Sequence, residues 1–564
     1  MVVSVCGVEL PFFNNDDSVN NVKGEAVDRD AIGLSYVGDA VYNSLRMKHF
    51  LYHNRLWNCT SGRVVGKLHQ TPNVQDAFEN PDDPPASHDD WFPKKMGEII
   101  ARTEIWCDIM SLGPPDGLFM DAFKEALMRL HERATEGKPI TVRMMFGNIV
   151  GMPVNCNAVM EELTADIPSD THIRVWVGAW RKGTSWNHAK IIAVDGRYLH
   201  TGGHNLWDAH YLKHNPVHDL SLEMEGRVTH DGHLFANEQW AFIKARQDTC
   251  VGQIAENIPD NVPLIWKTRV IVSEFPKNVA PEFPPLYKMN MVPRYQKVPN
   301  PIQMITIGRL GTLLPISRPS DDAIIAMINS SKKIIRAQLQ DLGPVCVPNT
   351  KMALPGCSWP KPYLRALGQA IWDRGVDVEI ILSNPHSIPG GLGMTEACYG
   401  NGWSCVDVAA EIIKTIKTQH PFAKTENLRR KVEQNLRICF MRHKQKTHYS
   451  DGTTIGLHSK HFIIDDVCAY IGSQNLYVCD LAEWGVVIDN ENQVKKFLGE
   501  CWKPFWEASF TGEDVDVQTV MDGLDHDRDG EHIYLLSSTA NAKMEAAAAG
   551  GLHGGHSKFY HKVN

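Results

Sequence analysis

The stretch HAKIIAVDGRYLHTGGHN, residues 188–205, returns in altered form as HSKHFIIDDVCAYIGSQN, residues 458–475. Five residue types keep the same offsets in both stretches: His, Lys, Asp, Gly and Asn. Each stretch predicts a strand, a tight turn at the acidic residue and a returning strand, because Asp and Gly between apolar runs favour turns. Side chains at i and i+2 of a strand share a face, so the His and Lys of each copy are expected to point the same way. The duplication predicts two related halves, each contributing one copy.

The segments around the two copies follow one order. A buried strand precedes an amphipathic helix; further strands, the duplicated motif, one more strand and a closing helix follow. In the first part these segments are the strands 103–112, 140–147, 172–178 and 220–226 and the helices 116–137 and 234–247. In the second part they are the strands 332–340, 376–384, 435–443 and 484–490 and the helices 363–375 and 491–506. The predicted fold class is α/β: two pseudo-twofold-related α-β-α-β-α sandwich halves, with mixed sheets and the helices outside.

Composition along the chain sets the expected boundaries. Residues 259–301 are Pro-rich and are expected to link a first half, residues 91–258, to a second half, residues 302–512. Residues 1–90 are expected to form a polar, partly helical lead-in. Residues 513–564, rich in Asp, Gly, Ala and His, are expected to form a flexible tail.

The overall composition is that of a globular protein. It argues against a nucleic-acid-binding, a membrane-spanning and a secreted protein. The chain has 564 residues, a formal charge of -9 and a pI of about 6.3. A dedicated nucleic-acid binder usually carries a basic excess, so nucleic acid is disfavoured as a partner. The chain contains no run of about 18 apolar residues, so no transmembrane segment is expected. The start lacks the features of a signal peptide and the 13 Cys residues include no CxxC pair, so reduced thiols and a cytoplasmic location are expected. The protein is also expected to be a monomer.

The residue types of the paired motif suit phosphodiester cleavage. One of the imidazoles of His188 and His458 can attack phosphorus and form a phosphohistidine, while the other protonates the departing alcohol. The lysines and asparagines can hold the non-bridging oxygens and stabilise the charge of the transition state. A Lys two positions after each His is a poor neighbour for a metal, so neither a metal nor another cofactor is expected. The candidate catalytic residues are His188, His458, Lys190, Lys460, Asp195 and Asp465, and the candidate phosphate-binding residues are Asn205, Asn475, Gly203 and Ser473.

Four acidic residues need separate interpretation. Asp219 and Glu483 each lie at the strand that follows a motif, and they are expected to fix the histidine tautomers from behind. Asp195 and Asp465 complete the motif and join the candidate catalytic set, but a turn or structural role is favoured over direct chemistry. One copy of the motif could arise by coincidence, whereas two copies at equivalent points of a repeat indicate a shared site.

At these residues the chain resembles the phospholipase D superfamily, whose signature is the paired HxKx4D motif. The resemblance is greatest to the compact bacterial-type enzymes and runs from roughly Thr71 to Phe510, most clearly in the segments 185–226 and 458–488. It implies two halves with one active site at their interface, metal-independent hydrolysis or transphosphatidylation, and a phosphohistidine. It further implies that His188 is the nucleophile and His458 the acid.

The same resemblance implies which residues contact the phosphate. The phosphate ligands would be Lys190, Lys460, Asn205 and Asn475. Ser473 matches the serine of the second motif in the family, while Gly203 replaces it in the first. The lead-in and tail have no counterpart, and the bacterial enzymes are secreted, which leaves location and physiological substrate open.

Three functions remain to be distinguished. The favoured one is an enzyme on phospholipid headgroups at a membrane surface, with water or a primary alcohol as acceptor. Aromatic residues near the motifs could line a headgroup pocket or belong to the core: Trp180, Trp186, Trp207, Tyr211, Tyr477 and Trp484. The alternatives are a nuclease or other phosphodiesterase of the same superfamily, and a catalytically inactive lipid- or phosphate-binding scaffold. Two intact motifs argue against the scaffold.

Overall fold

The structure is a computed structural model of the 564-residue chain. The residues that it describes are 4–5, 8–9, 33–72, 91–149, 153–182, 185–212, 216–247, 271–277, 284–292, 298–311, 318–344, 358–384, 387, 403–443, 446–449, 452, 454–477, 480–510, 514–515 and 520–521. Structural statements below refer to these residues.

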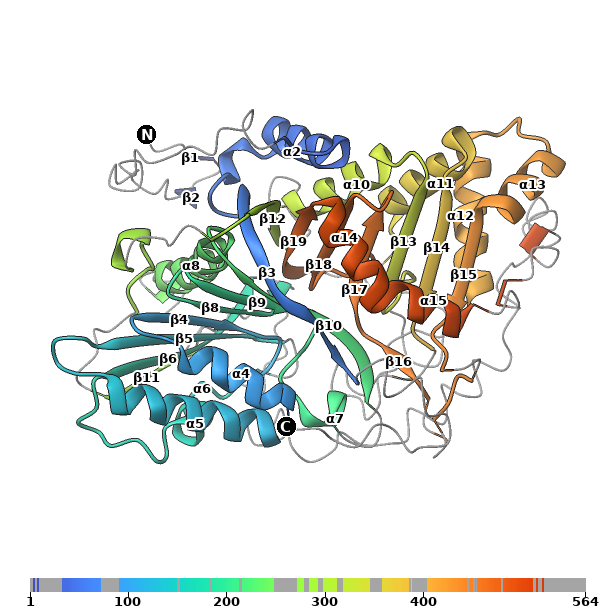
Figure 1. The fold of residues 1–564 in the computed structure, drawn as a ribbon. Helices are drawn as coiled ribbons and strands as arrows, with labels where there is room; N and C mark the ends of the chain where they lie inside the picture. The colour runs from blue at the N-terminus through green and yellow to red at the C-terminus, as the bar shows by residue number, and fades with distance from the viewer. Residues whose placement is uncertain are drawn as a thin grey trace.

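The first half of the molecule is built on a mixed sheet (Figure 1). Its strands are β3 (Trp57–Thr71), β4 (Trp106–Met110), β5 (Ile140–Gly147), β6 (Ile173–Lys182), β8 (Ile191–Val194), β9 (Tyr198–Gly202), β10 (Val217–Glu225) and β11 (Ile271–Phe275). Their order is β11-β6-β5-β4-β8-β9-β10-β3, with β4, β5 and β6 parallel and the other neighbours antiparallel.

The second half repeats this order. Its strands are β12 (Ile302–Leu310), β13 (Ile334–Leu339), β14 (Asp377–Leu382), β15 (Leu436–Phe440), β17 (Lys460–Ile464), β18 (Cys468–Gly472) and β19 (Leu481–Asp489). The order is β15-β14-β13-β17-β18-β19-β12, again with one parallel trio, β13 to β15. Each strand of the second sheet therefore has a counterpart in the first, and the predicted pair of related mixed sheets is confirmed.

Helices cover both sheets. They are α2 (Tyr36–Lys48), α4 (Trp91–Ala101), α5 (Gly117–Arg133), α6 (Cys156–Leu163), α7 (Asp208–Tyr211), α8 (Val228–Gln247), α10 (Pro319–Ser330), α11 (Lys361–Arg374), α12 (Cys405–Gln419), α13 (Thr425–Asn435), α14 (Glu491–Phe497) and α15 (Lys503–Ser509). Single turns are η1 (Phe50–Tyr52), η2 (Met289–Met291) and the π-helical η4 (Leu498–Trp502), and β1 (Ser4–Val5) and β2 (Val8–Glu9) form a separate hairpin. None of the described helices is long and apolar enough to cross a bilayer.

The alternation of side chains along the strands separates three cores. In β6, Val175 and Val177 pack in the core formed with α4, α5 and α6, whereas Trp176 and Trp180 pack with α8. The core that contains α8 also takes in α14, α15 and the inner faces of β18 and β19. A third core lies between the second sheet and α2, α10, α11, α12 and α13. One apolar layer thus joins the two halves and fixes their relative position.

Strand β3 corrects the expectation that residues 1–90 are only a lead-in. Residues 57–62 pair with β12 of the second half, and residues 63–71 pair with β10 of the first half. This long strand crosses between the halves in Figure 1 and belongs to both sheets. Among the described residues of this range, α2 and the short turn η1 fit the expected partly helical lead-in.

The expected linker and tail also contribute to the packed structure. Within residues 259–301, β11 pairs with β6, and the buried ring of Tyr287 stacks on His233. Within residues 513–564, Val520 and Met521 are buried in the core of the second half, and Asp514 pairs with Arg442. The rest of the expected tail lies outside the described residues.

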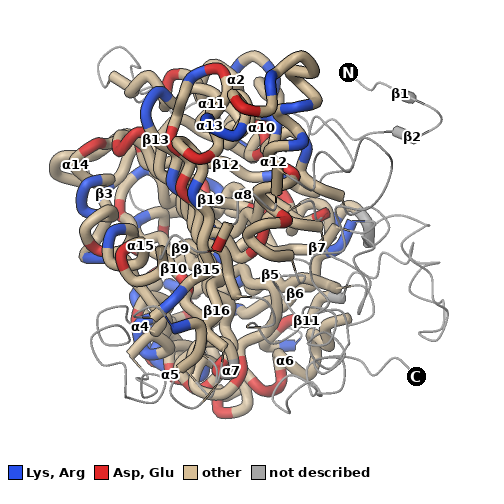
Figure 2. Tube along the Cα trace, turned by 90° about the vertical axis from the view of Figure 1, so that its right-hand side faces the viewer, with Lys and Arg blue, Asp and Glu red and all other residues tan. Residues whose placement is uncertain are grey.

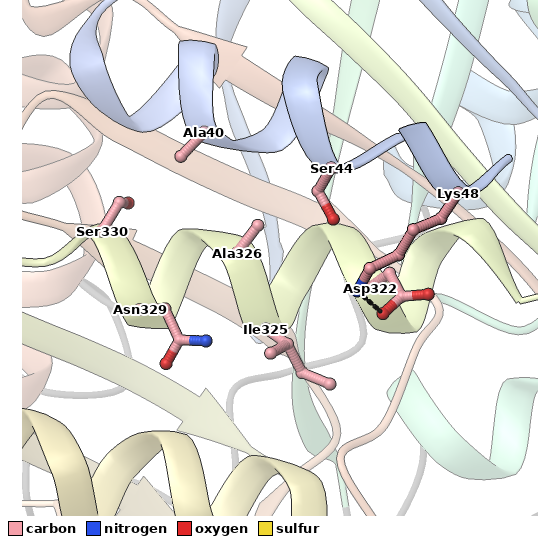
Figure 3. A pocket seen from close by; sticks show the side chains of 8 residues that line it. All are labelled: Ala40, Ser44, Lys48, Asp322, Ile325, Ala326, Asn329 and Ser330. Carbon is pink, nitrogen blue, oxygen red and sulfur yellow. Dashed lines mark hydrogen bonds and ion pairs between the residues drawn. The ribbon is translucent and has the colours of Figure 1, made fainter. Parts of the chain in front are cut away.

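Helix α2 packs against the second half of the molecule. The hydroxyl of Tyr36 donates to the carboxylate of Asp465, and Lys48 forms a 2.8 Å ion pair with Asp322 of α10. Figure 3 shows this ion pair beside an open hollow of about 310 Å³ between α2 and α10. Because Asp465 follows β17 and His458 precedes it, Tyr36 contacts the end of β17 opposite to the histidine.

Candidate active site

Two short strands bring each histidine onto the other half of the molecule. Strand β7 (Ser185–Asn187), which precedes His188, runs parallel to β19, and the backbone N–H of His188 donates to Ala482 O at 2.8 Å. Strand β16 (Gly456–Leu457), which precedes His458, runs parallel to β10, and the N–H of His458 donates to His218 O at 2.7 Å. The two halves therefore exchange strands at the point where their motifs begin.

The orienting carboxylates are crossed in the same way. Nδ1 of His188, in the first half, lies 2.9 Å from Oε2 of Glu483 in the second half. Nδ1 of His458, in the second half, lies 2.6 Å from Oδ2 of Asp219 in the first half. All four side chains are buried. A carboxylate behind Nδ1 fixes the ring and its tautomer. Each half thus supplies a histidine for one pair and a carboxylate for the other.

Burial dominates the electrostatics of the four basic side chains. It lowers the pKa of His188 to about 4 and that of His458 to about 3, assisted by the positive charges of the two lysines. Burial also lowers the pKa of Lys460 to about 8, and burial together with the charge of Lys460 holds the pKa of Lys190 well below its ordinary value. The site without a ligand therefore favours neutral imidazoles. An anion that binds beside the lysines would stabilise their buried positive charges.

The two carboxylates remain charged despite their burial. Burial alone would raise the pKa values of Asp219 and Glu483, but the histidine partner of each carboxylate, together with the charge of Lys460 at Asp219 and of Arg309 and Lys190 at Glu483, outweighs it and holds both pKa values below the ordinary range. Each ammonium is also tied to its own motif: Lys190 Nζ donates to His188 O at 2.6 Å, and Lys460 Nζ donates to His458 O. The lysines are thereby held next to the histidines.

The two asparagines have unused hydrogen-bonding capacity. Among the described residues, Oδ1 of Asn205 and Oδ1 of Asn475 are buried and have no hydrogen-bond partner. The Nδ2 of Asn475 donates to Tyr477 OH at 2.9 Å. Buried polar atoms without a protein partner are rare and suit a site that binds a ligand. A half-turn of either amide would present its NH₂ group to a phosphate oxygen.

Gly203 and Ser473 occupy equivalent positions with different consequences. A Cβ on Gly203 would overlap Oδ1 of Asp219, so the short carboxylate leaves no room for a side chain there. In the second half, the Ser473 hydroxyl donates to Oε2 of the longer Glu483 at 2.5 Å. This crowding explains why the first motif has Gly203 at the position where the second motif has Ser473.

We expect Gly203→Ala to displace Asp219, to destabilise the protein by about 1–3 kcal/mol through overpacking, and to lower turnover at least roughly tenfold because His458 loses its carboxylate. The matched substitution Ser473→Ala removes one hydrogen bond and should cost about 1 kcal/mol, with a smaller loss of turnover. Thermal unfolding and steady-state rates for both variants check this. Equal losses in the two variants would contradict the crowding argument.

Asp195 and Asp465 have structural roles, which corrects their place in the candidate catalytic set. Both adopt positive φ, 52° in each case, at the turns after β8 and β17. The Asp195 carboxylate accepts three backbone N–H groups at the start of β4, at 2.7–2.9 Å, and the Asp465 carboxylate accepts three at the start of β13, at 2.6–2.7 Å. Both carboxylates are therefore turned toward the sheet backbone, at the end of the strand away from the histidine.

The aromatic residues near the motifs divide between core and site. Trp180 and Trp484 are core residues. Tyr211 donates to Oδ2 of Asp219 at 3.0 Å and accepts the backbone N–H of Asn205 at 2.8 Å. Trp207 and Trp186 pack with Leu112 and Ile149 in a small cluster, and the ring of Trp207 contacts His210, which in turn contacts His458. Tyr211 was predicted only as an aromatic residue of the pocket or core, and Arg309, which lies 3.7 Å from Glu483, was not predicted at all.

Comparisons with known proteins extend this picture. No protein-family model matches the chain. The chain is 23% identical over 467 residues to "Phospholipase D" of Streptomyces antibioticus, which spans 74% of this chain and 76% of that protein. The structure of this chain resembles that of phosphatidylserine synthase of Haemophilus influenzae Rd KW20, with a TM-score of 0.45 and 12% identity over 87% of this chain and 97% of the other. It resembles NucT from Helicobacter pylori with a TM-score of 0.21 and 14% identity, over 36% and 96%.

Proposed function

Because the chain belongs to the phospholipase D superfamily, we propose that it cleaves the headgroup phosphodiester of a phospholipid, by hydrolysis or by transfer to a primary alcohol. The observation that carries the proposal is the crossed pairing of His188 with Glu483 and of His458 with Asp219. Each oriented imidazole has a carboxylate partner from the other half, and the charges of Lys190 and Lys460 act on both rings, which supports a single shared site. A nucleophile and a separate acid are what a two-step phosphoryl transfer requires.

In the first proposed step, Nε2 of neutral His188 attacks phosphorus. The P–N bond forms, the P–O bond to the leaving alcohol breaks, and the proton on Nε2 of His458 passes to that alcohol. In the second step, neutral His458 takes a proton from water or an incoming alcohol, whose oxygen attacks phosphorus. The P–N bond breaks, its electron pair returns to His188, and both imidazoles recover their starting states.

Positive charge in this mechanism comes from the protein itself. Lys190 and Lys460 offset the phosphate charge, and Asn205 and Asn475 bind its non-bridging oxygens. The two His-bound carboxylates stabilise whichever imidazole is protonated. We therefore propose that the reaction needs no added metal.

Two observations favour a phospholipid as the substrate. The similarity to a named phospholipase D over 467 residues favours a phospholipid. Figure 2 shows Lys and Arg interspersed with Asp and Glu along the described trace in that view, which suits a lipid headgroup better than a long polyanion. We propose a monomer acting at a membrane surface, with a cytoplasmic location as a further prediction. The alternatives are a nuclease and an inactive scaffold, and the following experiment distinguishes both from a phospholipase.

We expect the protein to release the headgroup from phosphatidylcholine vesicles and, with ethanol present, to form phosphatidylethanol, in EDTA as well as without it. The reason is that an intermediate waiting for a second nucleophile accepts an alcohol in place of water. Lipid products are measured by mass spectrometry, with single-stranded DNA as the parallel substrate. Loss of all activity in EDTA with recovery on adding a divalent ion would contradict metal independence. Cleavage of DNA alone would favour the nuclease, and no turnover of either substrate would favour the scaffold.

A further inference from the structure

The two catalytic carboxylates occupy equivalent positions in the sheets but face different residues. In the pairing of β12 with β19, Glu483 lies opposite Arg309. In the pairing of β3 with β10, Asp219 lies opposite Thr71. Because β12 and β19 correspond to β3 and β10 in the repeated strand order, Arg309 and Thr71 are pseudo-twofold equivalents. A cation therefore stands in one half where a neutral hydroxyl stands in the other.

Arg309 belongs to a buried network that ends on Glu483. Its NH2 group lies 3.7 Å from Oε1 of Glu483, an ion pair rather than a hydrogen bond, and its NH1 donates to Oδ1 of Asp321 at 2.8 Å. Asp321 also accepts the hydroxyl of Tyr363 at 2.6 Å and Nε2 of Gln474 at 3.1 Å. Burial opposes the charge of Arg309, but Asp321 and Glu483 raise its pKa and keep it cationic. The guanidinium thus places a fixed positive charge behind Glu483.

Neutral groups surround the other carboxylate outside the two motifs. Asp219 accepts the hydroxyl of Tyr211 at 3.0 Å and the backbone N–H of Leu220 at 2.8 Å. His204 also faces it, but burial lowers the pKa of His204 to about 4, so this ring is neutral. Thr71 is bound to the same ring, with Oγ1 at 2.7 Å from Nε2 of His204. Among the described residues, Asp219 therefore interacts with the ammonium of Lys460 but with no guanidinium like that of Arg309.

On the basis of the function proposed above, we propose that Arg309 is the positioning residue that divides the roles of the two histidines. By offsetting the charge of Glu483, it keeps His188 unprotonated, as a nucleophile must be. Asp219, which lies opposite Thr71 instead, stabilises the imidazolium of His458, as an acid requires. The asymmetry acts through the carboxylates and not through contact with substrate.

In the unliganded site the pKa of His458, about 3, lies below that of His188, about 4, because beyond burial Lys460 acts most strongly on His458, so the proposed division needs a bound anion. His188 faces Glu483, Lys190 and Lys460, and Tyr470 lies behind Glu483. Among the charges that act on the pKa of His188, the largest effect is that of Glu483; for His458 it is that of Lys460. A bound phosphodiester anion offsets the lysines, so it removes the main obstacle to protonating His458. Burial still opposes protonation of His188, and in this proposal the guanidinium behind Glu483 adds to that opposition.

The test uses the His458→Ala variant, in which only His188 acts, and a phosphatidyl ester of p-nitrophenol, whose leaving group departs without a proton. The pH dependence of the p-nitrophenol burst then reports the protonation of His188 directly. Because protonated His188 cannot attack, the rate falls as the pH falls through the pKa of His188. Arg309→Gln removes the charge and should raise the pKa of His188. The acid limb, the part of the pH–rate profile where the burst rate falls at low pH, should then shift to higher pH by roughly one unit. Arg309→Lys should leave the limb near its starting position.

Asp321→Asn supplies a variant with the opposite expected sign. Without the carboxylate of Asp321, the charge of Arg309 acts more fully on Glu483, so the acid limb should move to lower pH. Loss of folding alone could not move the limb in opposite directions in two variants. Arg336→Gln is the matched control, because Arg336 pairs with Glu379 and Asp466 in the same half, and no shift is expected.

The outcomes separate this inference from the function on which it rests. A burst with an unshifted limb in both Arg309→Gln and Asp321→Asn would overturn the role of Arg309 and leave the two-histidine chemistry standing. No burst in the His458→Ala variant with Arg309 intact would overturn the proposed function itself. Shifts in opposite directions, with Arg309→Lys and Arg336→Gln unshifted, are the expected result.

Discussion

Replacing either His188 or His458 with alanine is expected to lower turnover of a phospholipid by at least roughly 10⁴-fold, because the nucleophile and the acid act as one unit. The structure supports equal dependence on the two, since each ring is buried and held by its own carboxylate. Steady-state release of the headgroup from vesicles measures the loss. Asp231→Asn is the matched control: this buried carboxylate binds Asn58 and Thr306 rather than a motif residue.

The two alanine variants should differ with the p-nitrophenyl ester. His458→Ala should release about one equivalent of p-nitrophenol and then stop, because no base remains to activate water. His188→Ala should release none. Mass spectrometry after a mild quench should place the phosphatidyl group on the peptide that holds His188. A label on the peptide that holds His458 would reverse the proposed roles, and substantial turnover of phospholipid by either variant would reject the two-histidine mechanism.

The second large effect is expected for Asp219→Asn, which should lower turnover of a phospholipid by roughly 10³- to 10⁴-fold with little change in shape. An amide cannot stabilise the imidazolium of His458, and its NH₂ group favours the wrong tautomer. Because the acid matters less when the leaving group is stable, the loss should be much smaller for the first burst with the p-nitrophenyl ester. Equal losses on both substrates would contradict an action through His458.

The repeated strand order could be predicted from the sequence because most strands carry strong local signals. β5, for example, is a mostly apolar segment at residues 140–147, and the observed bounds match the predicted ones. The turn after β8 was recognisable from Asp195-Gly196, and both residues adopt positive φ there. Local patterns of this kind do not depend on where the two halves meet.

Strand β3 escaped prediction because its burial is polar. Asn58, Thr60 and Ser61 are buried side chains in the part of the strand that pairs with β12. Gly62 is required by close approach, since a Cβ there would lie 2.7 Å from Glu225 O. A search for apolar runs or strict alternation overlooks such a strand, whose two sheet neighbours come from distant parts of the chain.

The identities of the site residues were predictable, but their partners were not. The spacing of the motif led to His188, His458, Asp219 and Glu483, all of which the structure places together. Their crossing depends on the exchange of β7 and β16 between the halves, a contact between segments far apart in the chain. The role proposed for Arg309 follows from the register of two neighbouring strands, which no linear pattern displays.

The crossed pairing is the central claim, and one measurement tests it most directly. The burst of p-nitrophenol is compared in three proteins: His458→Ala, His458→Ala with Asp219→Asn, and His458→Ala with Glu483→Gln. Since Asp219 acts through a ring that is already absent, its substitution should leave the burst rate within about threefold, whereas Glu483→Gln should slow it by roughly 10³-fold or more by removing the partner of His188. The opposite pattern, a burst abolished by Asp219→Asn and preserved in Glu483→Gln, would show that each half orients its own histidine and would contradict the account.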